Sequence, residues 1–311
     1  MIEIRRILCP IDFSEFSRRA FDHAVAIAKW YESTITVLHV LPTPVPVVYA
    51  PGPVPVPSAV FTREDRSQLL LEMNQFAEGE AGSQVPTEFS VSEGHAADEI
   101  LAAATSIPAD LIVIGTHGRS GFERIVLGSV TEKVLRKAMC PVLSVPRQMS
   151  DVVPAPGVLF KHILCAIDFS DCSMRALNYA MSLAQEADAH LTVVHVIEVP
   201  IEAPADFRET GLGDLRGRQT LAEYVASTEQ ERRARLADAV PDTVRAYCTV
   251  DTVVAVGKPY REILRIASEQ HSELIVMGIH GRGAAELLFF GSTTQHIVRQ
   301  AACPVLTLRT G

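Results

Sequence analysis

The chain contains the same order of motifs twice, and this duplication constrains its fold more than any other feature. The stretch ILCPIDFS at 7–14 returns as ILCAIDFS at 163–170, and RKAMCPVLSV at 136–145 returns as RQAACPVLTL at 299–308. Repeats that keep their order indicate two copies of one folding unit. A length of 311 residues also suits two domains of ordinary size better than a single core.

The boundaries of the two copies follow from where the matches begin and end. We predict a first domain at 1–147, a second at 159–311, and a linker at 148–158, which contains two prolines. The copies differ most after their second apolar run, where 41–60 carries seven prolines and 197–220 is polar. Because proline is stiff and cannot donate to a sheet, we expect an extended surface segment at 41–60, or alternatively a ligand for a partner domain.

Each copy alternates short apolar runs with helical patterns, which is typical of a parallel sheet covered on both faces. In the first copy the expected strands are 5–11, 34–40, 86–92, 110–115 and 141–145. The expected helices are 15–31, 62–81, 96–106 and 129–138. The second copy follows the same plan. The fold class is therefore α/β, with two tandem, doubly wound, Rossmann-like domains, each built on a five-stranded parallel sheet.

The overall charge and the cysteines exclude several kinds of function. The net charge of −9, without runs of Lys and Arg interleaved with aromatic residues, argues against a nucleic-acid surface. We see no signal peptide and no uninterrupted apolar run of membrane-spanning length, so we expect a cytoplasmic protein without membrane insertion. The six cysteines include no Cys-x-x-Cys pair and no zinc spacing with histidine, so no protein-held metal is expected.

Three spaced glycines follow the fourth expected strand of each copy. The sequence reads LIVIGTHGRSGFERIVLGSV from 111 and LIVMGIHGRGAAELLFFGST from 274. In a doubly wound sheet, ligands bind beyond the carboxyl ends of the strands, where the strand order reverses. Glycines there let backbone N–H groups approach an anion and adopt positive φ, and the start of the next helix attracts phosphate. The pattern predicts a phosphate site in each copy, with Arg119 or Arg282 as the nearby cation.

Simpler interpretations of these residues remain open at this stage. SVTE at 129–132 is a Ser-x-x-Glu capping box, and STTQ at 292–295 is its glutamine counterpart. An alternative is therefore that both serines cap helices and have no role in binding. An alternative role for Asp12 and Asp168 is to support the turns that follow them, without any contact to a ligand. Among the histidines, His39 and His195 are expected to be packed and hydrogen-bonded rather than basic catalysts.

The glycine spacing is neither that of a Walker loop nor that of the dinucleotide fingerprint. It resembles the G-x-x-G-x9-G-[S/T] loop of the universal stress protein family, in its ATP-binding branch. ILCPIDFS, VLHV, GTHGR and CPVLSV stand in that family's order, as do their counterparts in the second copy. The resemblance covers nearly the whole chain and is weakest in 41–82 and 197–243. It implies an adenine nucleotide alpha hydrolase-like fold and a bound ATP, with ADP and AMP as alternatives and Mg²⁺ brought by the nucleotide.

The resemblance also implies roles for individual residues. Asp12 and Asp168 would contact the adenine side of the nucleotide. The base would be walled by Pro10, Ile11, Val40, Ala166, Ile167 and Val196. Ribose and phosphates would be held in the first copy by Gly115, His117, Gly118, Arg119, Gly128, Ser129, Val130 and Thr131. In the second copy they would be held by Gly278, His280, Gly281, Arg282, Gly291, Ser292, Thr293 and Thr294. His117 and His280 either touch phosphate or support the loop.

A further implication of the resemblance concerns assembly and activity. The family's dimers join through their last strands, so CPVLSV and CPVLTL are expected to pair and make the chain an internal pseudo-dimer, which could dimerise again. Because the bulky ELLFF at 286–290 replaces ERIVL, the second site is expected to differ in shape or affinity. No catalytic residues stand out. We expect an adenine nucleotide-dependent regulator read by a protein partner. The alternatives are a slow ATPase, a self-phosphorylating protein with Ser129 or Ser292 as acceptor, and a nucleotide-free scaffold.

Overall fold

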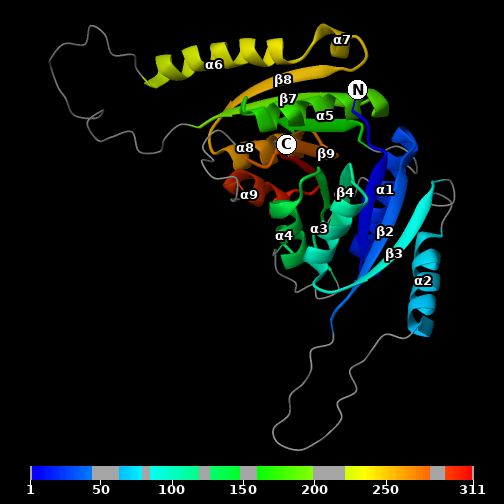
Figure 1. Cartoon of the computed structure of the whole chain (residues 1–311). Helices are drawn as coiled ribbons and strands as arrows, with labels where there is room; N and C mark the ends of the chain where they lie inside the picture. The colour runs from blue at the N-terminus through cyan, green and yellow to red at the C-terminus, as the bar shows by residue number, and fades with distance from the viewer. Residues whose placement is uncertain are drawn as a thin grey trace, which may run out of the picture.

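All strands of the described structure belong to one ten-stranded sheet with the order β3-β2-β1-β4-β5-β10-β9-β6-β7-β8 (Figure 1). The computed structural model describes residues 2–43, 63–78, 85–118, 127–147, 160–198, 221–280 and 291–309. The predicted linker at 148–158 and most of the proline-rich segment at 41–60 lie outside these residues. The two halves of the sheet are the two sequence copies, and within each half neighbouring strands are parallel.

The elements of the first half lie close to their expected positions. They are β1 (Arg6–Ile11), α1 (Glu15–Tyr31), β2 (Thr34–Leu41), α2 (Arg63–Ala77), β3 (Thr87–Glu93), α3 (Ala96–Ser106), β4 (Leu111–Gly115), α4 (Ser129–Lys137) and β5 (Val142–Val145). Every predicted boundary is within one residue, except that α2 ends at Ala77 rather than 81. The strong periodicity of these segments explains why their limits could be predicted.

The second half repeats the plan with one addition. Its elements are β6 (His162–Ala166), α5 (Asp171–Ala187), β7 (His190–Ile197), α6 (Leu221–Ala239), α7 (Asp242–Arg245), β8 (Val250–Val256), α8 (Pro259–Glu269), β9 (Leu274–Gly278), α9 (Ser292–Gln300) and β10 (Val305–Leu308). The short helix α7 was not predicted. It contains a single turn, and one turn leaves no hydrophobic periodicity to detect.

The two halves join through their last strands. β5 and β10 pair antiparallel, with Leu143 opposite Leu306 at the centre of the register. The hydroxyl of Ser144 donates to the carbonyl of Val305 at 3.1 Å across this joint. The predicted pairing of CPVLSV with CPVLTL is therefore confirmed, and the two predicted five-stranded sheets form one continuous sheet.

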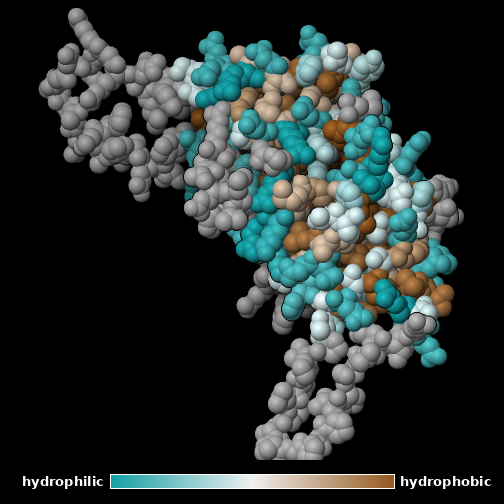
Figure 2. Space-filling model, in the orientation of Figure 1, coloured by the Kyte–Doolittle hydropathy of each residue, from teal (hydrophilic) through white to brown (hydrophobic). Residues whose placement is uncertain are grey.

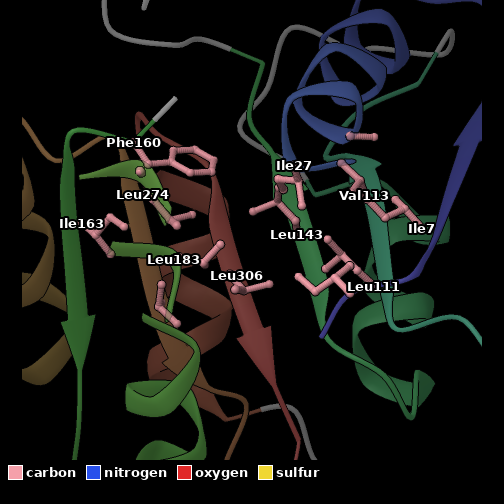
Figure 3. Close-up of a cluster of buried hydrophobic side chains, with 14 of the residues drawn as sticks. Ile7, Ile27, Leu111, Val113, Leu143, Phe160, Ile163, Leu183, Leu274 and Leu306 are labelled. Atoms are coloured by element: carbon pink, nitrogen blue, oxygen red, sulfur yellow. The ribbon is translucent and has the colours of Figure 1, made fainter. Parts of the chain in front are cut away.

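Helices cover both faces of the sheet, and each face has its own core. One core includes buried residues of α1, α2, α5 and α6, and the other includes buried residues of α3, α4, α8 and α9. Both cores run across the joint between the halves. Figure 3 shows the joint on the first face, where Ile27 and Leu143 of the first half approach Leu183 and Leu306 of the second.

Phe160, the residue just before β6, fills the seam between the halves. Its ring lies 6.0 Å from Trp30 in a T-shaped contact and 6.0 Å from His23, and both of these residues belong to α1. In the opposite direction, the N–H of Ile2 approaches the hydroxyl of Ser182 on α5 at 3.4 Å. Each half thus packs its leading segment on the first helix of the other half.

His23 makes the seam sensitive to pH. Its Nδ1–H donates to the carbonyl of Arg19 at 2.8 Å, while Nε2 is buried without a hydrogen-bond partner among the described residues. Burial lowers its pKa below the ordinary value, so the folded protein takes up this proton less readily than the unfolded chain. Stability should therefore fall as the pH drops below about 6.5, the ordinary pKa of histidine.

This pH dependence can be measured by urea unfolding at a series of pH values between 7.5 and 5. We expect His23→Gln to flatten the decline below about pH 6.5, whatever it costs at neutral pH. His95→Gln, which changes an exposed histidine, is the matched control and should leave the decline in place. An unchanged slope in His23→Gln would show that other groups cause the decline.

The surface is mixed in character. Figure 2 shows hydrophilic side chains over much of the face seen in Figure 1, broken by hydrophobic patches. Among the described residues, the exposed large hydrophobic side chains are those of Leu70, Leu71, Met139, Tyr247 and Val256, which come from four separate parts of the chain. In the part of the chain that the structure describes, no helix combines the length and the apolar character needed to cross a membrane.

Candidate functional site

The candidate site of each half lies where the strand order reverses. From β1 the chain goes outward to β2 and β3, and then crosses back to β4 and β5 on the other side of β1. Asp12 follows the end of β1, and Gly115 ends the neighbouring β4, so both stand at the same sheet edge. Asp168 and Gly278 occupy the same positions in the second half. Such an edge is where doubly wound sheets bind ligands.

Asp12 and Asp168 each support a tight turn. The Oδ1 atom of Asp12 accepts hydrogen bonds from the N–H of Ser14 at 3.1 Å and from its hydroxyl at 2.5 Å. The corresponding bonds from Ser170 to Asp168 measure 3.0 and 2.6 Å. Ser14 and Ser170 then cap α1 and α5. The predicted local role of the aspartates is therefore confirmed, and it holds one oxygen of each carboxylate in place.

The other oxygen of Asp12 faces the glycine loop. A Cβ placed on Gly118 would lie 2.7 Å from Oδ2 of Asp12, so a side chain at this position would collide with the carboxylate. The first half therefore brings the predicted adenine-side aspartate and the predicted phosphate loop together. Gly281, the counterpart of Gly118, lies outside the described residues together with Arg119 and Arg282.

Phenylalanine and histidine pack behind each aspartate. Phe13 and Phe169 have φ of 62° and 63°, in the left-handed region that is uncommon for bulky residues. Their rings lie 4.9 and 4.8 Å from those of His39 and His195. Both histidines donate from Nδ1 at 2.8 Å to the carbonyl of the last residue before the aspartate. The prediction that these histidines are packed and hydrogen-bonded is confirmed.

The glycines serve close backbone approach rather than positive φ. A Cβ on Gly115 would lie 3.1 Å from the carbonyl oxygen of Phe16, and one on Gly278 would lie 2.9 Å from the sulfur of Cys172. Gly128 and Gly291 both have φ of −58°. The predicted use of positive φ in these loops is therefore wrong for the glycines that the structure describes.

Gly128 and Gly291 bring the helix starts against the strand ends. The N–H of Gly128 donates to the carbonyl of Thr116 at 2.9 Å, and a Cβ on this glycine would meet the same oxygen at 3.1 Å. Gly291 donates to the carbonyl of Ile279 at 3.2 Å, and its Cβ would be 2.9 Å from that oxygen. Larger residues would push α4 and α9 away from the sheet edge.

The serines after these glycines do not cap the helices. Gly128 and Gly291 are the N-cap residues and lack a side-chain cap, while Ser129 and Ser292 are the first helical residues and are exposed. The capping-box alternative is therefore wrong for both serines. The first intrahelical bond of α4 runs from Glu132 to Gly128, so the three preceding N–H groups have no acceptor within the helix.

The threonines that follow hold the helix starts in place. Thr131 and Thr294 are buried, and their hydroxyls donate to the carbonyls of Gly115 at 2.8 Å and Gly278 at 3.2 Å. Their hydroxyls are engaged within the protein, so the anion contact predicted for these residues would fall to their backbone N–H groups. Val130 and Thr293 are half-buried in the same helical turns.

The predicted adenine wall is more deeply buried than a binding surface requires. Pro10, Ile11, Ala166 and Ile167 are all buried in the core and offer a base little side-chain surface. Val40 and Val196, near the ends of β2 and β7, are half-buried. In each half a base at the sheet edge would meet the local valine first, Val40 or Val196, with the buried residues of that half supporting it from below.

The two loop histidines differ. His117 is hydrogen-bonded through Nδ1 to the hydroxyl of Thr116 at 3.0 Å. Both ring nitrogens of His280 are buried without a hydrogen-bond partner among the described residues, and burial together with the positive charge of Arg309 lowers its pKa. Across the described ranges, no group of three His, Cys, Asp or Glu side chains could hold a metal ion.

The fold and the site together define a class: a tandem, Rossmann-like α/β protein with an Asp-Phe-Ser turn and a glycine loop at each switch point. The family model of the universal stress proteins matches this chain twice, over 3–146 and 159–309. The chain therefore belongs to the universal stress protein family, as a member with two tandem domains.

Individual relatives agree with this assignment. A universal stress protein of Methanocaldococcus jannaschii is 38% identical over 144 residues, which cover 46% of this chain and 82% of the relative. A tandem universal stress protein from Mycobacterium tuberculosis is 28% identical over 286 residues, which cover 88% of this chain and 87% of the relative. The crystal structure of a universal stress protein from Archaeoglobus fulgidus covers both chains completely, with a TM-score of 0.65 and 24% identity, and it supports the fold.

Proposed function

We propose that this protein binds an adenine nucleotide, ATP foremost, in one or both halves and acts as a nucleotide-dependent regulator in a stress response. The observation that carries the proposal is the meeting, at one switch point, of the Asp12 carboxylate, the glycine loop and the open start of α4. Each of these features suits a different part of a nucleotide. Membership of the universal stress protein family adds support to the proposal that these three features act together.

The start of α4 suits the phosphates. The N–H groups of Ser129, Val130 and Thr131 have no intrahelical acceptor, and the positive end of the helix dipole lies at the same place. The dipole contributes only about 0.3–1 kcal/mol for a favourable charge, so several donors must act together. The three amides at the start of α4 supply such a set in a protein of net charge −9.

The neighbouring residues suit the nucleoside. Asp12 presents a carboxylate that can accept hydrogen bonds from amino or hydroxyl groups, and half-buried Val40 gives apolar contact to a base. Mg²⁺ would be brought by the phosphates of ATP. Binding would change the surface around the start of α4, which a protein partner would read. A cytoplasmic location and the dimerisation of two chains are further parts of the proposal, and both are expectations from the sequence.

The first test is the nucleotide content of the protein itself. Freshly purified protein is denatured, released nucleotides are quantified by chromatography, and Mg-ATP, ADP and AMP are then titrated by calorimetry. Close to two nucleotides per chain would mean that both halves bind, and about one would mean that they have diverged. No released nucleotide and no heat at millimolar Mg-ATP would overturn the proposal and favour the scaffold. Transfer of labelled phosphate to the chain would support the self-phosphorylation alternative, with exposed Ser129 or Ser292 as the acceptor.

A further inference from the structure

Arg147 and Arg309 lie in corresponding places in the two halves, although the sequence repeat does not align them. Arg147 stands two residues after the end of β5, whereas Arg309 directly follows β10. The carbonyl of Arg147 accepts a hydrogen bond from Nη1 of Arg19 at 2.6 Å, and that of Arg309 accepts one from Nη1 of Arg175 at 2.7 Å. Arg19 and Arg175 are counterparts on α1 and α5. The same clamp therefore holds the backbone of both arginines.

The clamped arginines lie beside the beginning of each glycine loop. The N–H of Thr116 donates to the carbonyl of Val145 at 2.9 Å, and the N–H of Ile279 donates to that of Leu308 at 2.8 Å. The first loop residue after β4 or β9 is thus hydrogen-bonded to the end of the last strand of its half. A long cationic side chain one or two residues further along that strand is within reach of the loop.

Each arginine has an indirect link to the histidine of its glycine loop, through a shared ring in the first half and through its charge in the second. The guanidinium carbon of Arg147 lies 5.6 Å from the ring centre of Phe16, and this ring lies 6.0 Å from that of His117. In the second half, Arg309 is near enough to His280 for its charge to lower the pKa of that histidine. Arg147 therefore shares a ring contact with the histidine of its loop, and the charge of Arg309 acts on the histidine of the other loop.

The other described arginines at this edge of the first half have structural partners. Arg18 pairs with Asp22 at 3.6 Å and lies over the ring of Phe76, and Arg19 holds the carbonyl of Arg147. Arg147 is exposed and contacts the face of Phe16. An exposed cation over the half-buried ring of Phe16 is weakly held, whereas a guanidinium binds phosphate through strong, charge-assisted hydrogen bonds.

Building on the nucleotide site proposed above, we infer that Arg147 and Arg309 bind the terminal phosphates of the nucleotide in their own halves. They would thereby make each site prefer a triphosphate over a monophosphate. The anion would lie between the arginine and the free amides at the start of α4 or α9. Both ring nitrogens of His280 are unpartnered within the described residues, so this imidazole is a further donor for the same anion.

The test is a comparison of ligands that differ only in phosphate number. ATP, AMP and adenosine are titrated by calorimetry against the full-length wild type, Arg147→Gln and Arg309→Gln. Each variant should bind ATP about tenfold more weakly at one site, with adenosine affinity unchanged. Arg136→Gln, which changes an exposed residue in the last turn of α4, is the control and should bind ATP like the wild type.

The outcomes separate this inference from the proposed function. If the wild type binds no nucleotide, the proposed function fails. If the wild type binds ATP and both variants bind ATP as tightly as the wild type does, the inference is overturned and the proposed function stands. An equal loss for ATP and adenosine would also overturn it, because it would show that Arg147 only supports Phe16. Arg147→Lys should recover part of the preference for ATP over AMP, since lysine keeps the charge but loses the bidentate geometry.

Discussion

A chain carrying both Asp12→Ala and Asp168→Ala is expected to lose its nucleotide while remaining folded. Each substitution removes a carboxylate at the sheet edge, and a hydrogen bond to a charged group contributes about 1.5–3 kcal/mol. This corresponds to a loss of affinity of about ten- to a hundredfold per site. Calorimetric titration of Mg-ATP and chromatography of released nucleotide should both show the loss. The single variants should each remove one of two sites if both halves bind.

The asparagine variants distinguish the ligand contact from the local turn. Asp12→Asn keeps an oxygen that can accept the two hydrogen bonds from Ser14, whereas Asp12→Ala removes it. The alanine variant should still form α1, because the hydroxyl of Ser14 accepts the N–H of Ser17 independently at 3.2 Å. We expect the asparagine variants to have the thermal stability of the wild type and reduced ATP affinity. Wild-type ATP affinity in the alanine variants would mean that the aspartates serve only the turns.

Duplication made most of the fold predictable from the sequence. The strands and helices of the first half could be placed because short apolar runs alternate with helical patterns, and the second half offered the same pattern for comparison. The joint between β5 and β10 followed from the family resemblance and from two matching apolar strands. The single-turn helix α7 gave no periodic signal and was missed.

The sequence predicted where the candidate residues lie in the fold, but not the contacts that they make. A glycine needed for close approach and a glycine needed for positive φ look the same in a sequence, so the role of Gly128 was misjudged. The serine of SVTE looked like an N-cap, but it is the first helical residue of α4, and Gly128 before it is the N-cap. The clamp between Arg19 and Arg147 joins residues 128 positions apart, and no local pattern reveals such a contact.

The same long-range character applies to the seam between the halves. Phe160 was assigned no role from the sequence, although it is 1% exposed and touches Trp30 and His23 of the other half. Its φ of 61° is unusual for a bulky residue, so packing must hold it in place. The seam that it fills is closely packed, because the cavity it lines with Ile27 and Leu306 measures only about 10 Å³.

Phe160→Ala is therefore expected to destabilise the whole chain by about 3–5 kcal/mol, the usual cost of removing a buried phenylalanine. The loss should appear as a lower urea midpoint for a single transition, because Phe160 couples α1 of the first half to the second half. Phe21→Ala is the matched control, since Phe21 is also buried but contacts Phe76 within its own half. We expect both variants to lower the midpoint of the same transition. Two separate transitions, with only the second half weakened by Phe160→Ala, would show that the halves unfold independently despite their shared core.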